Sequence, residues 1–310
     1  MAGITVIGEI GGTSSRWAFM EPDRSVRVFP NKGEVLSGFN PLNGDADQFV
    51  ASVSAYFKTN FPGYVDHGNV QVYGAGCGSP ERTQRMSEAL SRIWPTAEIA
   101  VDTDILGAAK GLCGSDPGLV LILGTGMSAG YWDGTNLFRP MPSLGFIIGD
   151  EGSGADIGRT ILQDAFYKRM AFHLIEALFG EDGPDLSLIL ESIHRSAFPA
   201  RALASYTAKL SVHREERYVR ELILSRFHAM AELLVLFFSP EQRANVAATG
   251  SVSFGFKELL AECLLDRGMT VSYTHLTLPA SGLVEISGVA GSLKKKHKKS
   301  AVKYISEKEK

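Results

Sequence analysis

The sequence has little of what marks several classes of protein. Its three cysteines, Cys77, Cys113 and Cys263, form no CxxC pair and no cluster with histidine. That scarcity argues against a disulfide framework, a zinc site and an iron–sulfur site. The chain carries 31 basic and 34 acidic side chains, a net charge of −3. Without a surplus of either sign, we expect neither a nucleic-acid partner nor binding to a membrane surface.

Long apolar runs and a Walker A motif are also missing. The chain leads directly into residues 4–7, Ile-Thr-Val-Ile, with no charged segment and no long apolar stretch before them. We therefore expect no signal peptide, no transmembrane helix and a cytoplasmic location. The first glycine turn lacks Gly-Lys-Ser/Thr, which excludes a P-loop there. The 310 residues, 45% apolar and 21% charged, suffice for two globular domains with separate cores.

Glycine and acidic residues concentrate in one stretch, residues 145–158, which read Gly-Phe-Ile-Ile-Gly-Asp-Glu-Gly-Ser-Gly-Ala-Asp-Ile-Gly. The apolar residues 146–148 predict a short buried strand or strand end. Residues 149–154 predict a tight turn. The apolar spacing beyond it predicts a helix that starts near Ser153 or Ala155.

The acids of this stretch allow two interpretations. A carboxylate held on a glycine-shaped turn can accept hydrogen bonds from a polar ligand such as a sugar. Alternatively, Asp150, Glu151 and Asp156 only cap the helix and complement its macrodipole. The local pattern favours neither interpretation.

A pattern of strand, Gly/Thr turn, strand, turn and strand occurs twice. The turns are Gly11-Gly12-Thr13 and Gly124-Thr125-Gly126. Such loops can hold phosphate through backbone N–H groups and hydroxyls, although either alone could be a plain turn. The predicted strands are residues 4–8, 16–20 and 26–29 in the first copy and 119–123, 129–132 and 137–138 in the second.

Residues 114–118, Gly-Ser-Asp-Pro-Gly, separate the two copies and predict a domain boundary. We expect residues 1–114 and 115–270 to form two domains of similar topology, each offering a phosphate-sized loop to a shared cleft. Other segments have helical spacing or the composition of a strand. They predict helices at residues 46–61, 80–94, 105–112, 186–194, 200–210, 218–238 and 254–266, and strands at residues 70–73, 97–101 and 245–248.

Two acids lie where a predicted strand passes into a helix, in the run Asp102-Thr103-Asp104. Open α/β sheets place ligand-binding groups at the carboxyl ends of their strands. One of these acids could therefore orient and deprotonate a hydroxyl nucleophile. The alternative, an acid that caps the helix, suits Asp102 better than Asp104. Cys77, in another turn, has no histidine or aspartate nearby in sequence and is interpreted as structural.

With these motifs in order, the sequence resembles the sugar kinases of the actin/hsp70/hexokinase superfamily. The likeness is strongest to the N-acetylglucosamine kinase-like group, which also contains N-acetylmuramate kinases and the ATPase activators of benzoyl-CoA reductase. It covers about residues 4–270, and its specific part is residues 148–154, Ile-Gly-Asp-Glu-Gly-Ser-Gly. The resemblance implies an α/β fold of two ribonuclease H-like actin/hexokinase-type lobes, each a mixed β-sheet flanked by helices, around an interdomain cleft.

The resemblance also implies roles for single residues. Asp104 would be the catalytic base and touch the sugar. Asn40, from the loop Gly38-Phe39-Asn40-Pro41, would contact the sugar together with Gly145 and Asp150. The two Gly/Thr turns would bind the ATP phosphates through Gly11, Gly12, Thr13, Gly124, Thr125 and Gly126, and Gly250 and Ser251 would bind adenosine.

The chain departs from this family in two places. The family usually has aspartate in the first phosphate loop, where it positions magnesium, and often a lysine shortly after. Here the acid is Glu9, and Ser14 and Ser15 leave no lysine. A longer carboxylate can still reach magnesium through water. The second departure is residues 271–310, which begin like translated sequencing-adapter read-through and are left out of the functional interpretation.

The sequence thus predicts an ATP- and Mg²⁺-dependent kinase that phosphorylates a hydroxyl of an amino sugar, N-acetylglucosamine or a relative such as N-acetylmuramate. Its expected partners are ATP and the sugar, and a homodimer is one option for its assembly. One alternative is a sugar sensor that has lost catalysis, as Glu9 and the missing lysine would suggest. Another is an ATPase that activates a partner reductase, which would need an interface cluster that the three cysteines are not spaced to form.

Overall fold

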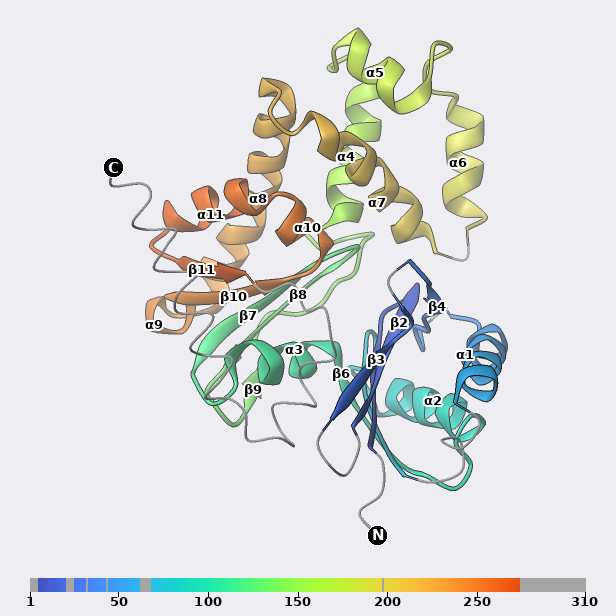
Figure 1. The fold of residues 1–310 in the computed structure, drawn as a ribbon. Coiled ribbons are helices and arrows are strands. Elements are labelled where there is room, and N and C mark those ends of the chain that lie inside the picture. Colours follow the sequence, from blue (N-terminus) through green and yellow to red (C-terminus); the bar gives the residue numbers. More distant parts are fainter. Residues whose placement is uncertain are drawn as a thin grey trace. The chain divides into compact units, whose positions relative to one another are not determined.

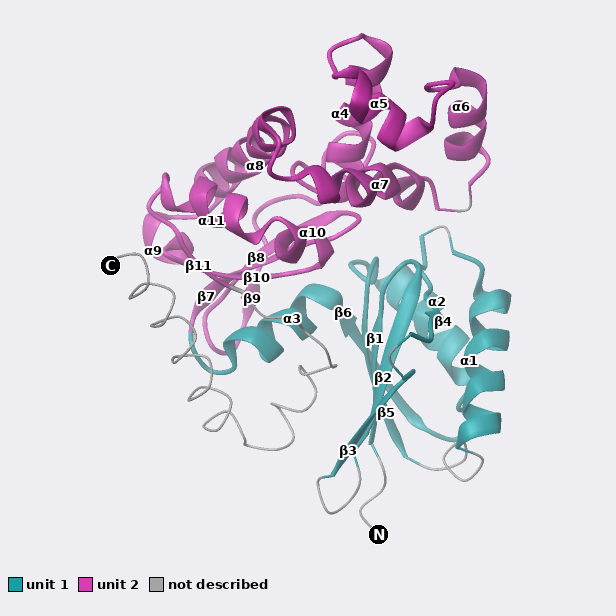
Figure 2. Cartoon of the chain, turned by 45° about the horizontal axis from the view of Figure 1, so that its top comes forward, with its two compact units in different colours: residues 1–116, 276–310 teal, residues 117–275 magenta. Residues whose placement is uncertain are grey.

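The computed structural model describes residues 5–20, 25–31, 33–42, 44–61, 68–196 and 198–273. These residues form two compact units, one up to Asp116 and one from Pro117 (Figures 1 and 2). The part of the predicted 271–310 tail after position 273 lies outside the described residues. None of the described helices combines the length and the apolarity that a membrane crossing needs.

The first unit is a mixed sheet with helices on both faces. Its strand order is β3-β2-β1-β5-β6, with β4 paired to β2. Strand β1 runs antiparallel to β2 and parallel to β5. The elements are β1 (Thr5–Ile10), β2 (Ser14–Met20), β3 (Val26–Phe29), β4 (Leu36–Ser37), α1 (Ala46–Asn60), β5 (Asn69–Gly74), α2 (Pro80–Ser91), β6 (Glu98–Thr103) and α3 (Asp104–Cys113).

The second unit repeats this sheet and adds more helices. Its strand order is β11-β10-β7-β8-β9, with β7 antiparallel to β8 and parallel to β10. The strands are β7 (Gly118–Leu123), β8 (Met127–Trp132), β9 (Leu137–Phe138), β10 (Asn245–Thr249) and β11 (Thr270–Tyr273). The helices are α4 (Gly154–Phe166), α5 (Phe172–Phe179), α6 (Leu186–His194), α7 (Pro199–Leu210), the 3₁₀ turn η1 (Ser211–His213), α8 (Arg217–Phe237), α9 (Pro240–Arg243), α10 (Ser251–Gly255) and α11 (Lys257–Leu265).

The two sheets therefore share one topology. In each, three antiparallel strands form a meander, and the first of them pairs on its other side with a parallel strand, which pairs with a second parallel strand. This confirms the fold predicted from the repeated strand–turn–strand pattern. The parallel pairings bring the carboxyl ends of β1, β5 and β6 to one edge of the first sheet. Those of β7 and β10 meet likewise in the second. Open α/β sheets bind ligands at such edges.

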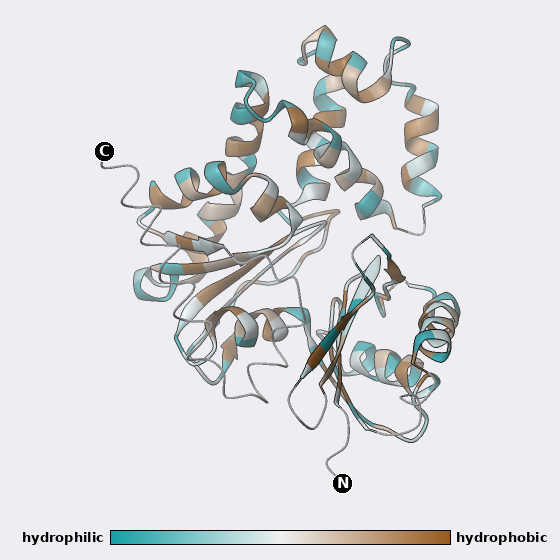
Figure 3. Ribbon diagram, viewed as in Figure 1, coloured by the Kyte–Doolittle hydropathy of each residue, from teal (hydrophilic) through white to brown (hydrophobic). Residues whose placement is uncertain are grey.

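Each sheet has its own apolar core. In the first unit, α1 and α2 cover one face through an aromatic cluster in which Trp94 lies edge-on to Phe57, with ring centroids 4.9 Å apart. Helix α3 covers the other face, where a Cβ atom on Gly107 would lie 2.7 Å from the Tyr73 ring. In the second unit, apolar residues of β7, α4, α8 and α11 form one cluster. Figure 3 shows that the strands are largely apolar and that the helices carry both apolar and polar residues.

Local sequence signals fix several helix starts. Asp45 caps α1 by accepting from the backbone N–H groups of Asp47 and Gln48. Ser79 caps α2, with Pro80 as its first residue, and Ser153 caps α4. Serine and aspartate supply acceptors to otherwise unpaired helical N–H groups, so these positions could be predicted from sequence.

Two predictions about secondary structure were wrong. Residues 146–148 form a turn and not a buried strand. The helix predicted over residues 254–266 is two helices, α10 and α11, which begin at Ser251 and break at Phe256. The short strand β4, which pairs with β2, was not predicted.

Candidate active site

The first glycine turn is fixed by backbone contacts. Gly11 N–H donates to the carbonyl of Ser14 at 2.9 Å, and Phe39 N–H donates to the carbonyl of Gly11 at 3.0 Å. A Cβ atom at position 38 would lie 2.2 Å from the oxygen of Gly11 and 2.7 Å from the nitrogen of Thr13. Only glycine allows the chain to pass so close, so Gly38 determines the shape of the turn.

Asn40 lies next to both the first glycine turn and Gly76, which follows β5. Its Oδ1 accepts from Leu42 N–H at 2.9 Å. A Cβ atom on Gly76, which has φ +80°, would lie 2.3 Å from the same Oδ1. A Cβ atom on Gly12 would lie 3.8 Å from the Asn40 Cβ. The structure therefore brings the predicted sugar-binding Asn40 to the predicted phosphate turn within the first unit.

Glu9 and Asp104 bring two carboxylates to the carboxyl edge of the first sheet. Glu9 is opposite Arg16 on β2 and Tyr73 on β5. Burial raises the pKa of Glu9 to about 7. The positive charge of Arg16 lowers it in part, and the negative charge of Asp104 raises it further. The two acids thus influence each other electrostatically, although they come from different elements.

Asp104, and not Asp102, is the acid that begins α3. The cap is Thr103, whose hydroxyl accepts from Leu106 N–H at 3.3 Å, so the interpretation of Asp102 as the cap was wrong. Asp102 instead accepts from the side-chain amide of Gln71 at 3.2 Å. Asp104 accepts from Ile105 N–H at 2.8 Å, which aligns its carboxylate with the start of the helix.

Two of the three cysteines lie in the apolar cores of the two units. Cys77 and Cys263 are buried and free. Burial raises the pKa of the Cys77 thiol to about 12 and that of Cys263 to about 11. Protonated, buried thiols are poor nucleophiles and poor metal ligands. This is consistent with a structural role for Cys77.

The second glycine turn is held by the segment that starts α4. Gly124 N–H donates to Gly126 O at 3.0 Å. Gly154 N–H then donates to Gly124 O at 2.8 Å, and Ala155 N–H to Thr125 O at 3.1 Å. The predicted phosphate turn and the start of α4 are therefore one hydrogen-bonded structure.

Gly250 lies against the same turn. It has φ +107°, and a Cβ atom there would lie 2.2 Å from Leu123 O and 3.1 Å from Gly124 N. The structure thus places the predicted adenosine position directly beside the predicted phosphate turn in the second unit. Ser251 is the first residue of α10 and not part of a free turn.

Asp150 lies over the second glycine turn. A Cβ atom on Gly126 would lie 2.8 Å from Asp150 Oδ2, and Met127 N–H donates to the same carboxylate. Burial raises the pKa of Asp150 to about 6, the Met127 hydrogen bond lowers it, and the negative charges of Glu151 and Asp156 raise it. Asp150 has φ +59°, the left-handed conformation that is uncommon outside glycine.

Gly145 begins the turn that leads to Asp150. It has φ +75° with open space around a would-be Cβ atom, and its carbonyl accepts from Gly149 N–H at 2.9 Å. Between them, Ile147 and Ile148 are 72% and 70% exposed. These residues therefore do not form the buried strand predicted at residues 146–148.

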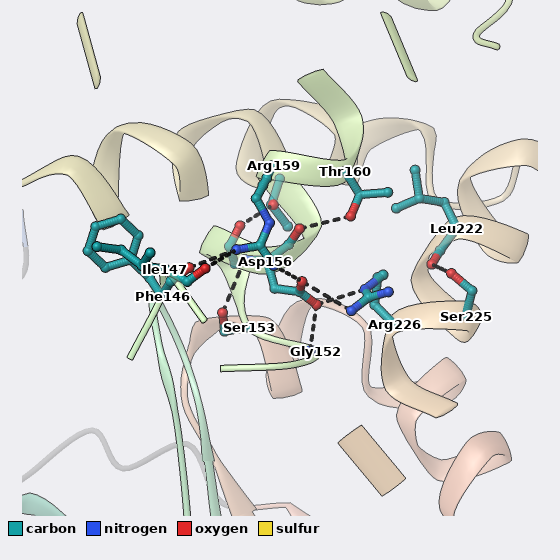
Figure 4. A network of polar contacts seen from close by, with 12 residues as sticks. Phe146, Ile147, Gly152, Ser153, Asp156, Arg159, Thr160, Leu222, Ser225 and Arg226 are labelled. Carbon is teal, nitrogen blue, oxygen red and sulfur yellow. Dashed lines mark hydrogen bonds and ion pairs between the residues drawn. The ribbon is translucent and has the colours of Figure 1, made fainter. Parts of the chain in front are cut away.

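Sequence reasoning missed the role of Asp156. Its side chain is 1% exposed and lies between the guanidinium groups of Arg159 and Arg226, each within 2.8 Å (Figure 4). It also accepts from Gly152 N–H at 2.9 Å. Arg159, three residues away on α4, was the only local signal, because Arg226 lies 70 positions further along the chain.

No family model matches the chain, and no curated protein matches its sequence. Solved structures do match. A candidate N-acetylglucosamine kinase from Porphyromonas gingivalis is 30% identical with a TM-score of 0.78, and the match covers 91% of this chain and 97% of that one. A candidate N-acetylglucosamine kinase from Chromobacterium violaceum is 16% identical with a TM-score of 0.64, over 91% and 99% of the two chains.

A more distant match shares the fold. It is a ROK family glucokinase from Streptomyces griseus, solved with glucose and AMPPNP, and it is 18% identical with a TM-score of 0.51 over 94% of this chain and 100% of that one. The Porphyromonas gingivalis protein, by contrast, is similar in sequence along nearly its whole length. The chain therefore belongs to the N-acetylglucosamine kinase-like family of sugar kinases, with the actin/hexokinase-type fold.

Proposed function

We propose that this protein is an ATP-dependent kinase that transfers the γ-phosphate to a hydroxyl of an amino sugar of the N-acetylglucosamine or N-acetylmuramate type. One observation carries this proposal: each unit pairs a glycine turn with a carboxylate at the carboxyl edge of its sheet. In the first unit these are residues 11–13 with Glu9 and Asp104, and in the second residues 124–126 with Asp150. Membership of the sugar-kinase family supports the same reaction class.

In this proposal Asp104 accepts the proton of the attacking sugar hydroxyl. Its position at the carboxyl end of β6, where Ile105 N–H orients it, suits a general base. Asn40, Gly145 and Asp150 contact the sugar. The backbone N–H groups of the two glycine turns stabilise charge on the transferring phosphoryl group, and Gly250 and Ser251 flank adenosine.

Magnesium, which the sugar-kinase family implies, suits the acids of the first unit. Mg²⁺ prefers oxygen ligands and is often held by one or two carboxylates together with substrate phosphates. Glu9, with a pKa raised by burial and by the nearby charge of Asp104, is an acid that a cation would stabilise in its ionised form. Glu9 would hold the ion, directly or through water, with Asp104 close by. The bound ion would neutralise phosphate charge.

A second function uses the same sites without turnover. The residue Glu9, where the family usually has aspartate, favours a sensor that binds sugar and nucleotide but does not transfer phosphate. Tight sugar binding by calorimetry, with no ADP released at any sugar tested, would support the sensor and contradict the kinase.

The kinase proposal is tested by a coupled ADP-release assay over a panel of N-acetylated and plain hexoses. We expect turnover with an N-acetylated amino sugar, which Asp104→Asn abolishes while sugar binding stays measurable. Asp102→Asn is the matched control, because Asp102 sits two residues away and accepts from Gln71. Turnover lost equally in both variants, or in neither, would remove Asp104 from the mechanism.

A further inference from the structure

Polar contacts hold the turn that carries Asp150 on both sides, next to the half-buried Phe146. Ile147 and Ile148 are largely exposed, so burial of their apolar side chains contributes little to holding it. Asp150 itself adopts φ +59°, a conformation that a non-glycine residue keeps only when its surroundings enforce it.

The polar cluster around Asp156 reaches this turn from both sides. After Asp150, Gly152 N–H donates to Asp156 Oδ2 at 2.9 Å. Before it, Arg159 Nη1 donates to Phe146 O at 2.8 Å and to Ile147 O at 3.3 Å. Arg159 Nη2 donates to Asp156 Oδ1 at 2.8 Å, which joins the two sides. Figure 4 shows the Arg159 side chain directed at these carbonyls.

Arg226 of α8 completes the cluster. Its Nε and Nη2 donate to the two oxygens of Asp156 at 2.8 and 3.1 Å. Each Asp156 oxygen thus accepts two hydrogen bonds, and the buried charge is compensated. The arrangement fixes the start of α4, which in turn donates to the second glycine turn through Gly154 and Ala155.

We propose that Asp156 and Arg159 are positioning residues that hold Asp150 over the second glycine turn and so fix the sugar-binding carboxylate. The sugar-binding part of this inference rests on the proposed kinase function. The positioning part concerns the ligand-free protein alone, because the contacts link residues 146, 147 and 152 without any ligand.

Helix α4 supplies a matched comparison. Asp164, eight residues after Asp156, also links α4 to α8 by accepting from Tyr218 OH at 2.8 Å. Asp164 also forms an ion pair with Arg169, at 3.5 Å. These contacts do not involve the turn at residues 145–152. Asp164→Asn therefore weakens the α4–α8 connection without touching the turn.

The test compares Arg159→Met, Arg159→Lys and Asp164→Asn in the full chain. The Arg159 side chain is 35% exposed. Methionine keeps the aliphatic part of this side chain but donates no hydrogen bond to the turn. We expect Arg159→Met to speed amide hydrogen exchange of residues 146–152 by about tenfold or more, the scale of one lost charged hydrogen bond. The KM for the sugar should rise by about tenfold, with kcat changed by less than about threefold.

Arg159→Lys should fall between wild type and Arg159→Met, since lysine keeps one charged donor. Asp164→Asn should leave exchange in the turn and the sugar KM at wild-type values. Unchanged exchange in Arg159→Met, or equal effects of Asp164→Asn, would overturn the positioning role. If the wild type turns over no sugar, the proposed function fails, but the exchange measurement still tests the positioning role independently.

Discussion

Replacing Glu9 with glutamine would remove the charge of the acid at the end of β1 and keep its shape. Burial and the neighbouring Asp104 raise the pKa of Glu9 from 4.5 to about 7. Well below pH 4.5 Glu9 is protonated and uncharged in both the folded and the unfolded chain, so it adds no electrostatic cost to folding. As the pH rises toward 7, the unfolded chain loses this proton while the folded chain keeps it, and wild-type stability falls.

The size of the effect follows from the pKa difference. Each pKa unit corresponds to about 1.4 kcal/mol, so ionising Glu9 in the folded protein costs up to about 3 kcal/mol above pH 7. Glu9→Gln escapes this cost. We therefore expect the variant to match the wild type near pH 4.5, to gain on it as the pH rises, and to be more stable by up to about 3 kcal/mol at pH 8.

Urea unfolding at pH 5, 6, 7 and 8 measures this difference. Trp17 and Trp94 are buried in the core of the first unit, so their fluorescence reports that unit once Trp132 is replaced by phenylalanine in all samples. Glu98→Gln, at the exposed start of β6, is the control for a glutamate-to-glutamine change at an exposed position of the same sheet. A Glu9→Gln difference that stays constant or shrinks with rising pH would refute this account of the acid pair.

Two further predictions concern glycines at the proposed nucleotide site. Gly250→Ala should destabilise the protein by about 2 kcal/mol or more in urea unfolding and weaken nucleotide binding, because the new Cβ atom meets Leu123 O at 2.2 Å and φ is +107°. Gly268→Ala is the control, because Gly268 also has a positive φ, +70°, but no atom lies within 4 Å of a Cβ atom there. An equal loss of stability in both variants would show that backbone strain, and not the contact with Leu123 O, causes the effect. Gly38→Ala should cost about 1–3 kcal/mol and raise the KM for ATP, since the Cβ atom would displace Gly11. A wild-type KM for ATP would show that the first turn does not hold the phosphates.

The sheets could be predicted from sequence because their signals are local. Runs of β-branched and aliphatic residues interrupted by Gly/Thr turns define β1–β2 and β7–β8, and the repeated pattern gave the repeated topology. The starts of α2 and α4 could be predicted because Ser79 and Ser153 are residues that commonly cap helices. The glycines that touch other segments, such as Gly38 against Gly11, were visible only as part of a loop motif.

The turn at residues 146–148 could not be predicted from its composition. Three apolar residues between glycines have the pattern of a short strand. Two contacts hold them in a turn. Arg159 donates hydrogen bonds to the carbonyls of Phe146 and Ile147, and Gly149 N–H donates to the carbonyl of Gly145. The ion pair of Asp156 with Arg226 could not be predicted for the same reason, because Arg226 lies on a distant helix.

The steady-state kinetics and sugar affinity of Asp104→Asn test the central claim most directly. If Asp104 is the general base of a sugar kinase, kcat should fall by a factor of about 100 or more, while the sugar dissociation constant changes by less than about tenfold. Turnover at the wild-type rate in this variant would contradict the assignment of the reaction to this site.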